Sequence, residues 1–246
     1  MIEQHNTIII IPARMASTRL PGKPLADIHG VPMIVEVWKR AVSANVGHVL
    51  VAAAENAIAD AIRAVGGDAM VTEPRLPSGS DRIAAALALR DSAKRFEYVV
   101  NLQGDLPTID PLSVQRCLAG LTNVSVDIAT IAAAITEEAD VANPNIVKAI
   151  VPLEGDREVA YARDFVRVVD AEMKAPFWHH IGVYAYHRSS LERFVKLPVS
   201  SREKERSLEQ MRALDNGMRI AVVKVDTVPL GVDTPADLEL ARRMLK

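Results

Sequence analysis

The sequence has little cysteine, no excess of basic residues and no long apolar run, and each shortage excludes a class of protein. Cys117 is the single cysteine, so no internal disulfide can form, and the six histidines give no cysteine–histidine cluster at zinc spacing. Lysine and arginine number 29 against 31 acidic residues, a formal net charge of −2. Binding to nucleic acid needs cations clustered over a whole face, so we expect no nucleic-acid partner.

Targeting and membrane segments are also missing. No stretch reaches 18 continuous apolar residues, so we expect no membrane insertion. The first residues include Glu3 and His5 in place of a basic region followed by an apolar one, which argues against a signal peptide and predicts a cytoplasmic protein. At 246 residues and 49% hydrophobic, the chain can bury a sizeable core in one domain, or in one domain with a subdomain.

Strand and helix patterns alternate over the first hundred residues. Four isoleucines at 8–11 predict a strand buried on both faces that ends at Pro12. The patterns that follow predict helices at 31–42 and 57–65 and strands at 46–53, 69–72 and 98–102. This alternation predicts an α/β fold, Rossmann-like and doubly wound around a mainly parallel sheet. Further along, 177–186 reads as a strand and 202–214 as one helix, whereas 153–176 has no clear period.

A cationic loop follows the first predicted strand. It carries Arg14, Arg19 and Lys23, with a flexible Gly22 between two prolines. Cations at the carboxyl end of a strand predict an anion site, although a solvated, charged connection is the alternative. The loop is not a Walker A loop, which would need glycine in place of Ser17, and no G-x-G-x-x-G follows the strand.

Two aspartates follow the ends of predicted elements. Asp105 comes after the strand at 98–102, behind Gly104, and Asp233 precedes a helix that starts near Pro235. Such carboxylates suit Mg²⁺ when phosphates and water supply its other ligands. A tight turn at Asp105 and a favourable helix dipole at Asp233 are the alternatives.

On a strand, adjacent side chains point to opposite faces, so His179 and His180 cannot both line one site. His180 and Tyr184 are four residues apart, an even offset that places them on the same face.

The loop from Pro12 to Leu25 resembles the signature of the sugar nucleotidyltransferases, and in its full length that of the 3-deoxy-manno-octulosonate cytidylyltransferases. Five further motifs extend the resemblance over nearly the whole chain: Ser78-Gly79-Ser80-Asp81-Arg82, Asn101-Leu102-Gln103-Gly104-Asp105, Asn143-Pro144-Asn145-Ile146-Val147-Lys148, His180-Ile181-Gly182-Val183-Tyr184 and Leu208-Glu209-Gln210-Met211-Arg212. The resemblance implies a fold of the nucleotide-diphospho-sugar transferase type. It implies one nucleotidyltransferase domain over 1–246, with a sugar-binding and dimerisation subdomain inserted at about 153–215.

The resemblance also implies an activity: transfer of CMP from CTP to the 2-hydroxyl of 3-deoxy-D-manno-octulosonate, with release of pyrophosphate, for lipopolysaccharide biosynthesis. It implies a homodimer and Mg²⁺ as cofactor, held by Asp105 and Asp233. The catalytic residues that the resemblance implies are Arg14, Lys23, Asp105 and Asp233. The nucleotide-binding residues that it implies are Ala13, Arg14, Arg19, Lys23, Ser78, Gly79, Ser80 and Gln103. The sugar-binding residues that it implies are Arg163, His180, Tyr184, Glu209 and Gln210.

The chain departs from the family pattern at four places. Glu55 ends an Ala-Ala-Glu where Ala-Thr-Asp is frequent, and Pro77, His179 and Arg206 replace residues near the implied sugar site. An 8-amino octulosonate or a sialic acid therefore remains an alternative acceptor. A nucleotide-binding protein without catalysis is the second alternative.

Overall fold

The four isoleucines form the middle of β1 (Thr7–Ala13), which is buried along its whole length. β1 pairs in parallel with β4 (His48–Ala53) on one side and with β6 (Tyr98–Asn101) on the other, and β5 (Asp68–Val71) extends the sheet beyond β4. The prediction that the strand ends at Pro12 is wrong, because Pro12 and Ala13 still pair with β4. The register with β6 stops at Ile10, so the proline lies where β1 has lost one neighbour.

The computed structural model describes residues 1–123, 125–170 and 172–246, which divide into two compact units. The first unit combines Met1–Gln115 with Pro229–Lys246, and the second is Arg116–Val228. α4 (Pro111–Ala119) carries the chain from the first unit into the second. The subdomain expected at about 153–215 falls inside the second unit, and its proposed roles stay predictions.

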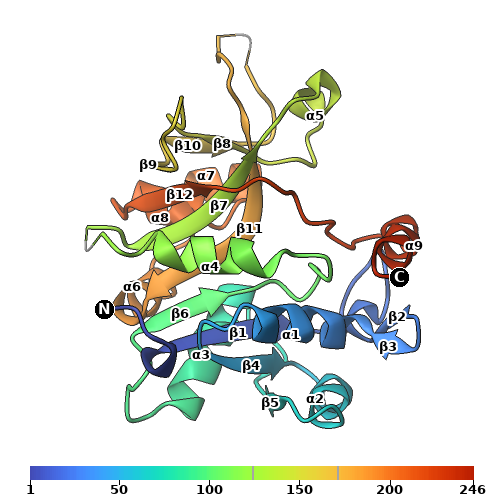
Figure 1. Ribbon diagram of the computed structural model, residues 1–246. Coiled ribbons are helices and arrows are strands. Elements are labelled where there is room, and N and C mark those ends of the chain that lie inside the picture. The colour runs from blue at the N-terminus through green and yellow to red at the C-terminus, as the bar shows by residue number, and fades with distance from the viewer. Residues whose placement is uncertain (124, 171) are drawn as a thin grey trace. The chain divides into compact units, whose positions relative to one another are not determined.

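In the first unit, the chain runs outward from β1 to β4 and β5 through α1 (Met33–Ser43) and α2 (Asn56–Arg63), and α3 (Gly79–Arg90) then leads to β6 on the other side of β1. Right-handed crossovers in opposite directions place α3 on the face opposite α1 and α2 (Figure 1). The predicted α/β fold with a doubly wound parallel sheet is confirmed. The carboxyl ends of β1 and β6 form the point where the strand order reverses, which is where such sheets bind ligands.

The last helix, α9 (Pro235–Met244), belongs to the first unit although the second unit precedes it in the sequence. It packs near the small hairpin of β2 (Asp27–Ile28) and β3 (Val31–Pro32), where Ile28, Leu238 and Ala241 share a buried cluster. Two 3-10 helices, η1 (Gln4–Asn6) and η2 (Lys23–Leu25), complete this unit. The packing of α9 fixes the segment that carries Asp233.

The second unit is built around β7 (Ile128–Ala134), antiparallel to β11 (Trp178–His187) and parallel to β12 (Ile220–Lys224). Shorter strands border it: β9 (Val159–Tyr161) pairs with β12, and β8 (Lys148–Ile150) pairs with β10 (Asp164–Val166) and β11. Its helices are α5 (Glu138–Ala142), α6 (Arg188–Phe194), α7 (Ser201–Arg206) and α8 (Met211–Asp215).

The prediction of one helix over 202–214 is wrong, since α7 and α8 are separated at Ser207, which adopts a left-handed backbone with φ of 52°. Among the described residues, no helix combines the length and apolarity that crossing a membrane requires.

Candidate active site

The cationic loop between β1 and η2 is fixed by hydrogen bonds to its own backbone and to a distant carboxylate. Gly22 has φ of 70°, and its N–H donates to the carbonyl of Met15 at 3.4 Å. The N–H of Met15 donates to the Glu55 carboxylate at 3.0 Å. Glu55, one of the departures from the family pattern, therefore anchors the loop from the N-cap position of α2.

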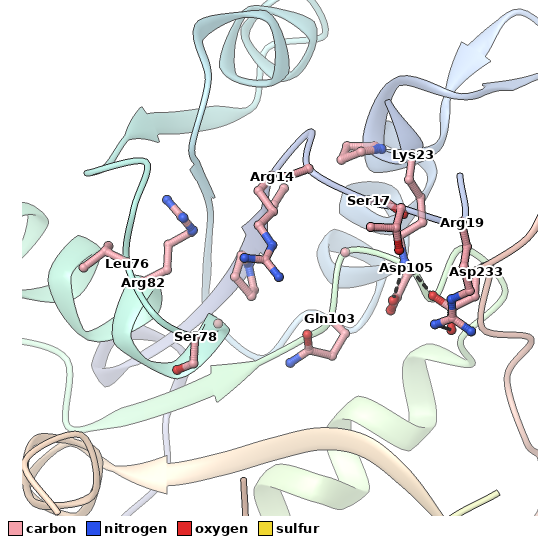
Figure 2. Close-up of a pocket in the computed structure, with 17 residues that line it drawn as sticks. Arg14, Ser17, Arg19, Lys23, Leu76, Ser78, Arg82, Gln103, Asp105 and Asp233 are labelled. Atoms are coloured by element: carbon pink, nitrogen blue, oxygen red, sulfur yellow. Dashed lines mark hydrogen bonds and ion pairs between the residues drawn. The ribbon is translucent and has the colours of Figure 1, made fainter. Parts of the chain in front are cut away.

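The loop borders a cavity of about 390 Å³ at the carboxyl ends of β1 and β6, within the first unit (Figure 2). The structure brings nine of the predicted residues to this one cavity: Ala13, Arg14, Arg19, Lys23, Ser78, Gly79, Gln103, Asp105 and Asp233. Ser80 is not among them, because it is buried in the first turn of α3. The side chains labelled in Figure 2 come from four segments: the loop after β1, the segment that enters α3, the exit of β6 and the segment before α9.

Lys23 lies between the two predicted metal ligands. Its Nζ donates to Asp105 Oδ2 at 2.8 Å and to Asp233 Oδ1 at 3.0 Å (Figure 2). Burial opposes the charge of the ammonium, but the attraction of Asp105 and the hydrogen bonds to both carboxylates outweigh it, so the pKa of Lys23 is raised. Arg19 Nη2 contacts Asp233 Oδ2 at 2.9 Å, so a second cation meets the same carboxylate.

The two carboxylates fit a divalent cation. Their oxygens converge on one nitrogen, and the ammonium of Lys23 shows that positive charge is stable at this point. Carboxylate oxygens are the ligands that Mg²⁺ prefers. Within the described ranges, no cluster of three or more His, Cys, Asp or Glu side chains could hold a metal alone, so further ligands would have to come from phosphate and water.

Two backbone features bring Asp105 and Asp233 together despite their distance in sequence. The N–H of Val232 donates to the carbonyl of Asp105 at 2.9 Å, which ties the segment before α9 to the exit of β6. At Gly104, a Cβ would lie 3.0 Å from the carbonyl oxygen of Pro12 and 3.2 Å from Ile34 Cδ1, so a larger residue would push the loop away.

The amino terminus of α3 forms the opposite wall of the cavity. Ser78 Oγ caps the helix by accepting from the N–H of Asp81 at 3.1 Å. At Gly79, a Cβ would lie 3.4 Å from Pro12 Cγ. The lack of a side chain therefore lets the end of the helix approach β1 closely. A helix amino terminus favours anions and hydrogen-bond acceptors of a base.

Arg82, also on α3, lines the cavity and was not among the predicted site residues. Its buried guanidinium donates to Thr72 Oγ1 and to the carbonyls of Glu73 and Pro74. Burial lowers its pKa; the charge of Glu55 opposes this shift and the charge of Arg14 adds to it. Arg82 thus fixes the segment that leads to the cap of α3. Its position at the end of the Ser-Gly-Ser-Asp-Arg motif was the sequence feature from which its place at the site could have been predicted.

In the second unit, His180 and Tyr184 lie together, as their even offset predicted, with ring centroids 5.5 Å apart. Burial, aided by the neighbouring His179, lowers the pKa of His180 to about 3, so its imidazole is neutral. Burial also raises the pKa of the Tyr184 phenol, and the charge of Glu209 adds to this effect.

The remaining predicted sugar residues have different surroundings. Gln210 is buried, and its Nε2 has no hydrogen-bond partner within the described part of the chain. Arg163 is exposed and borders a different cavity of about 520 Å³, which Asn123 and Tyr161 also line.

A doubly wound sheet whose switch point carries three cations, a helix amino terminus and a pair of carboxylates defines a nucleotide-binding protein. The comparison with protein families agrees: residues 8–220 match the model described as cytidylyltransferase, and the chain belongs to this family.

The relatives define the branch. The chain is 54% identical to the 3-deoxy-manno-octulosonate cytidylyltransferase of Paramagnetospirillum magneticum over 239 residues, which cover 97% of both chains. It is 56% identical to the enzyme of the same name from a Bradyrhizobium species, over 97% of this chain and 96% of the relative. A solved structure of CMP:2-keto-3-deoxy-manno-octonic acid synthetase complexed with CTP superposes with a TM-score of 0.87 at 37% identity, covering 97% and 98% of the two chains. The chain is therefore a nucleotidyltransferase of the 3-deoxy-manno-octulosonate cytidylyltransferase branch, and the resemblance inferred from the motifs is confirmed.

Proposed function

We propose that this chain transfers CMP from CTP to the anomeric 2-hydroxyl of 3-deoxy-D-manno-octulosonate and releases pyrophosphate. The convergence of Asp105 and Asp233 on Lys23, inside a cavity lined by three arginines, is the observation that carries the proposal. The names of the relatives and the CTP-bound neighbour support the choice of nucleotide and acceptor.

Neutralisation of charge is the main task at the nucleotide site. A nucleoside triphosphate is strongly anionic, and an alcohol attacks it slowly unless that charge is offset and the leaving group is stabilised. Arg14 and Lys23 line the cavity, where they would bind the departing β- and γ-phosphates, and Arg19 adds a third cation. Ala13 and Gln103 are the residues proposed for the cytosine and ribose, whereas Ser80, which the resemblance also implied, is buried in α3 and does not line the cavity.

The reaction exchanges one P–O bond for another. The 2-hydroxyl oxygen of the sugar bonds to the α-phosphorus, the bond from that phosphorus to the bridging oxygen breaks, and pyrophosphate leaves with the electron pair while the hydroxyl proton is released. Asp105 and Asp233 would hold Mg²⁺, which supplies neutralisation of the phosphates and lowers the pKa of a bound hydroxyl.

His180, Tyr184, Glu209 and Gln210 of the second unit are the proposed sugar residues, with Arg163 for the carboxylate. Arg206, one of the residues that depart from the family pattern, forms hydrogen bonds within the second unit. Its Nη1 donates to Asp164 Oδ1 at 2.7 Å and to the carbonyl of Phe165 at 2.9 Å. The place in lipopolysaccharide biosynthesis, the homodimer and the cytoplasmic location stay part of the proposal.

Pyrophosphate release tests the substrate. Purified protein with CTP and MgCl₂ is offered 3-deoxy-manno-octulosonate, its 8-amino analogue and a sialic acid in parallel. We expect the octulosonate to give the highest kcat/KM. Equal or faster turnover of either other acid would reject the proposed acceptor.

Two substitutions test the carboxylate pair. Asp105→Asn and Asp233→Asn should each lower kcat by about 100-fold or more, because each removes a charged ligand of the Mg²⁺ that would neutralise the phosphates. Asp226→Asn, at an exposed carboxylate that pairs with Arg116, is the matched control and should leave kcat unchanged. Full turnover in both site variants would show that the pair does not serve the chemistry.

A further inference from the structure

An irregularity in β11 lies next to His180. Ile181 pairs with Ile131 and Tyr184 pairs with Thr130, so the two residues between Ile181 and Tyr184 have no partner on β7. Bulges of this kind re-aim side chains and occur often beside active sites. Here the bulge turns two backbone carbonyls towards one side chain: Thr130 Oγ1 lies 2.8 Å from the oxygen of Val183 and 3.3 Å from that of Ile181.

The hydroxyl of Thr130 has one hydrogen to share among three neighbours. Two of them are carbonyl oxygens, which only accept, and two oxygens 2.8 Å apart repel each other unless a hydrogen lies between them. The hydroxyl therefore donates into the bulge. Towards the third neighbour, His180 Nε2 at 3.0 Å, it must accept, so Nε2 carries the hydrogen. Thr130 is fully buried, which leaves no water to change this arrangement.

The hydrogen on Nε2 leaves the other ring nitrogen without one. The groups packed around the imidazole are the uncharged rings of Phe165 and Tyr184, and His179 is the adjacent titratable residue on β11. Burial keeps His180 neutral, with its pKa lowered to about 3, and Tyr184 is also neutral because its pKa is raised. Nδ1 accepts no hydrogen bond from the described residues. It does not belong to the buried atoms that lack a partner, so it keeps contact with solvent.

We propose that Thr130 is a positioning residue that fixes His180 as the Nε2–H tautomer, so that His180 offers the sugar acid only an acceptor and binds one of its hydroxyls, not its carboxylate. This inference rests on the proposed function, since it takes His180 as a sugar-binding residue. The donors that a carboxylate needs are supplied elsewhere in the same unit by Arg163, the residue proposed for the carboxylate.

Nitrogen-15 NMR of the full chain, labelled in histidine, tests the tautomer without turnover. We expect His180, assigned with His180→Asn, to show a protonated Nε2 and an unprotonated Nδ1 from pH 5 to pH 9. Adding 3-deoxy-manno-octulosonate should shift the Nδ1 resonance and leave that nitrogen unprotonated. A protonated Nδ1, or a titration of His180 near its ordinary pKa when the sugar is added, would overturn the proposal.

Two substitutions test the part played by Thr130. Thr130→Ser keeps the hydroxyl and should keep the tautomer, with the KM for the sugar within about twofold of the wild-type value. Thr130→Val removes the hydroxyl and should raise that KM by about tenfold, the effect of one hydrogen bond, with the KM for CTP unchanged. A tautomer that stays the same in Thr130→Val overturns the role of Thr130. If that variant does not fold, the wild-type spectrum still decides the tautomer on which the proposal depends. Absence of pyrophosphate release by the wild-type protein would reject the proposed function separately.

Discussion

At the residue scale, the central feature of the first unit is Lys23, whose ammonium lies between the carboxylates of Asp105 and Asp233. Two carboxylates that share one small volume repel each other, and the ammonium between them offsets that repulsion at 2.8 and 3.0 Å. A divalent cation bound by Asp105 and Asp233 would compete with Lys23 for the same oxygens. Once displaced, the lysine would be free to contact phosphate.

Lys23→Met should therefore separate metal binding from turnover. Without nucleotide, the variant should bind Mn²⁺ about tenfold more tightly than the wild-type protein, because its carboxylates have lost their ammonium partner. Its kcat should fall by about 100-fold or more, since a phosphate-binding cation is lost. Titration calorimetry gives the affinity. Lys39→Met, which removes an exposed lysine paired with Glu36, should change neither value. Weaker binding of Mn²⁺ in Lys23→Met would contradict the competition.

The neutral imidazole of His180 makes folding sensitive to acid. Burial lowers its pKa to about 3 from its ordinary value of 6.5, so between these values the unfolded chain binds a proton that the folded chain does not. The free energy of unfolding should thus fall as the pH drops below 6.5, by up to about 1.4 kcal/mol per pH unit from this group, and should gain nothing from it above 6.5.

Urea unfolding at intervals between pH 7.5 and pH 5 measures this slope. His180→Asn should reduce it by about the contribution of one proton, whatever the variant's absolute stability. An identical slope in wild type and His180→Asn would show that His180 is protonated in the folded protein.

At the element scale, the first unit could be predicted from its sequence more fully than the second. The site residues of the first unit lie at the end of a strand, in the loop that follows it or at the start of a helix, so local pattern and the rule for parallel sheets predicted most of them. The break between α7 and α8 has no such signal. The break depends on Arg167, whose guanidinium donates hydrogen bonds to the carbonyls of Arg206 and Ser207, 39 and 40 positions later in the sequence. Glu209 and Gln210 follow the break, so their setting could not be predicted from a helix pattern.

Substitutions at this break should affect stability in opposite directions. Arg167→Met loses donors to Arg206, Ser207 and Pro144, and should lower the free energy of unfolding by about 1 to 3 kcal/mol. Ser207→Gly should raise it by up to about 1 kcal/mol, because glycine adopts the left-handed backbone without strain. Thermal and urea unfolding measure both. Arg157→Met, which removes one long bond to Pro152, is the control and should have little effect. Stabilisation by Arg167→Met would show that the break does not depend on this side chain.

At the scale of the whole molecule, the residues predicted for the two substrates fall in different units. The predicted nucleotide residues all belong to the first unit, including Asp233, which reaches it only because the chain returns at Pro229. The predicted sugar residues all belong to the second unit. Glu55 and Thr130 contact Met15 and His180 across 40 and 50 positions of the sequence, and such contacts cannot be derived from local patterns.

Hydrogen exchange with mass spectrometry should therefore give two separate footprints. CTP with Mg²⁺ should slow exchange in the segments around the cavity of the first unit, at 12–25, 76–84, 103–107 and 230–237, because bound ligand suppresses local opening. The octulosonate should slow exchange at 178–186 and 205–212. Asp105→Asn is the matched control for the first footprint, since it weakens the metal site and leaves the second unit intact. Protection by CTP that is centred on 178–186, with the cavity segments unchanged, would mean that the nucleotide binds in the second unit and that the division of substrates between the units is wrong.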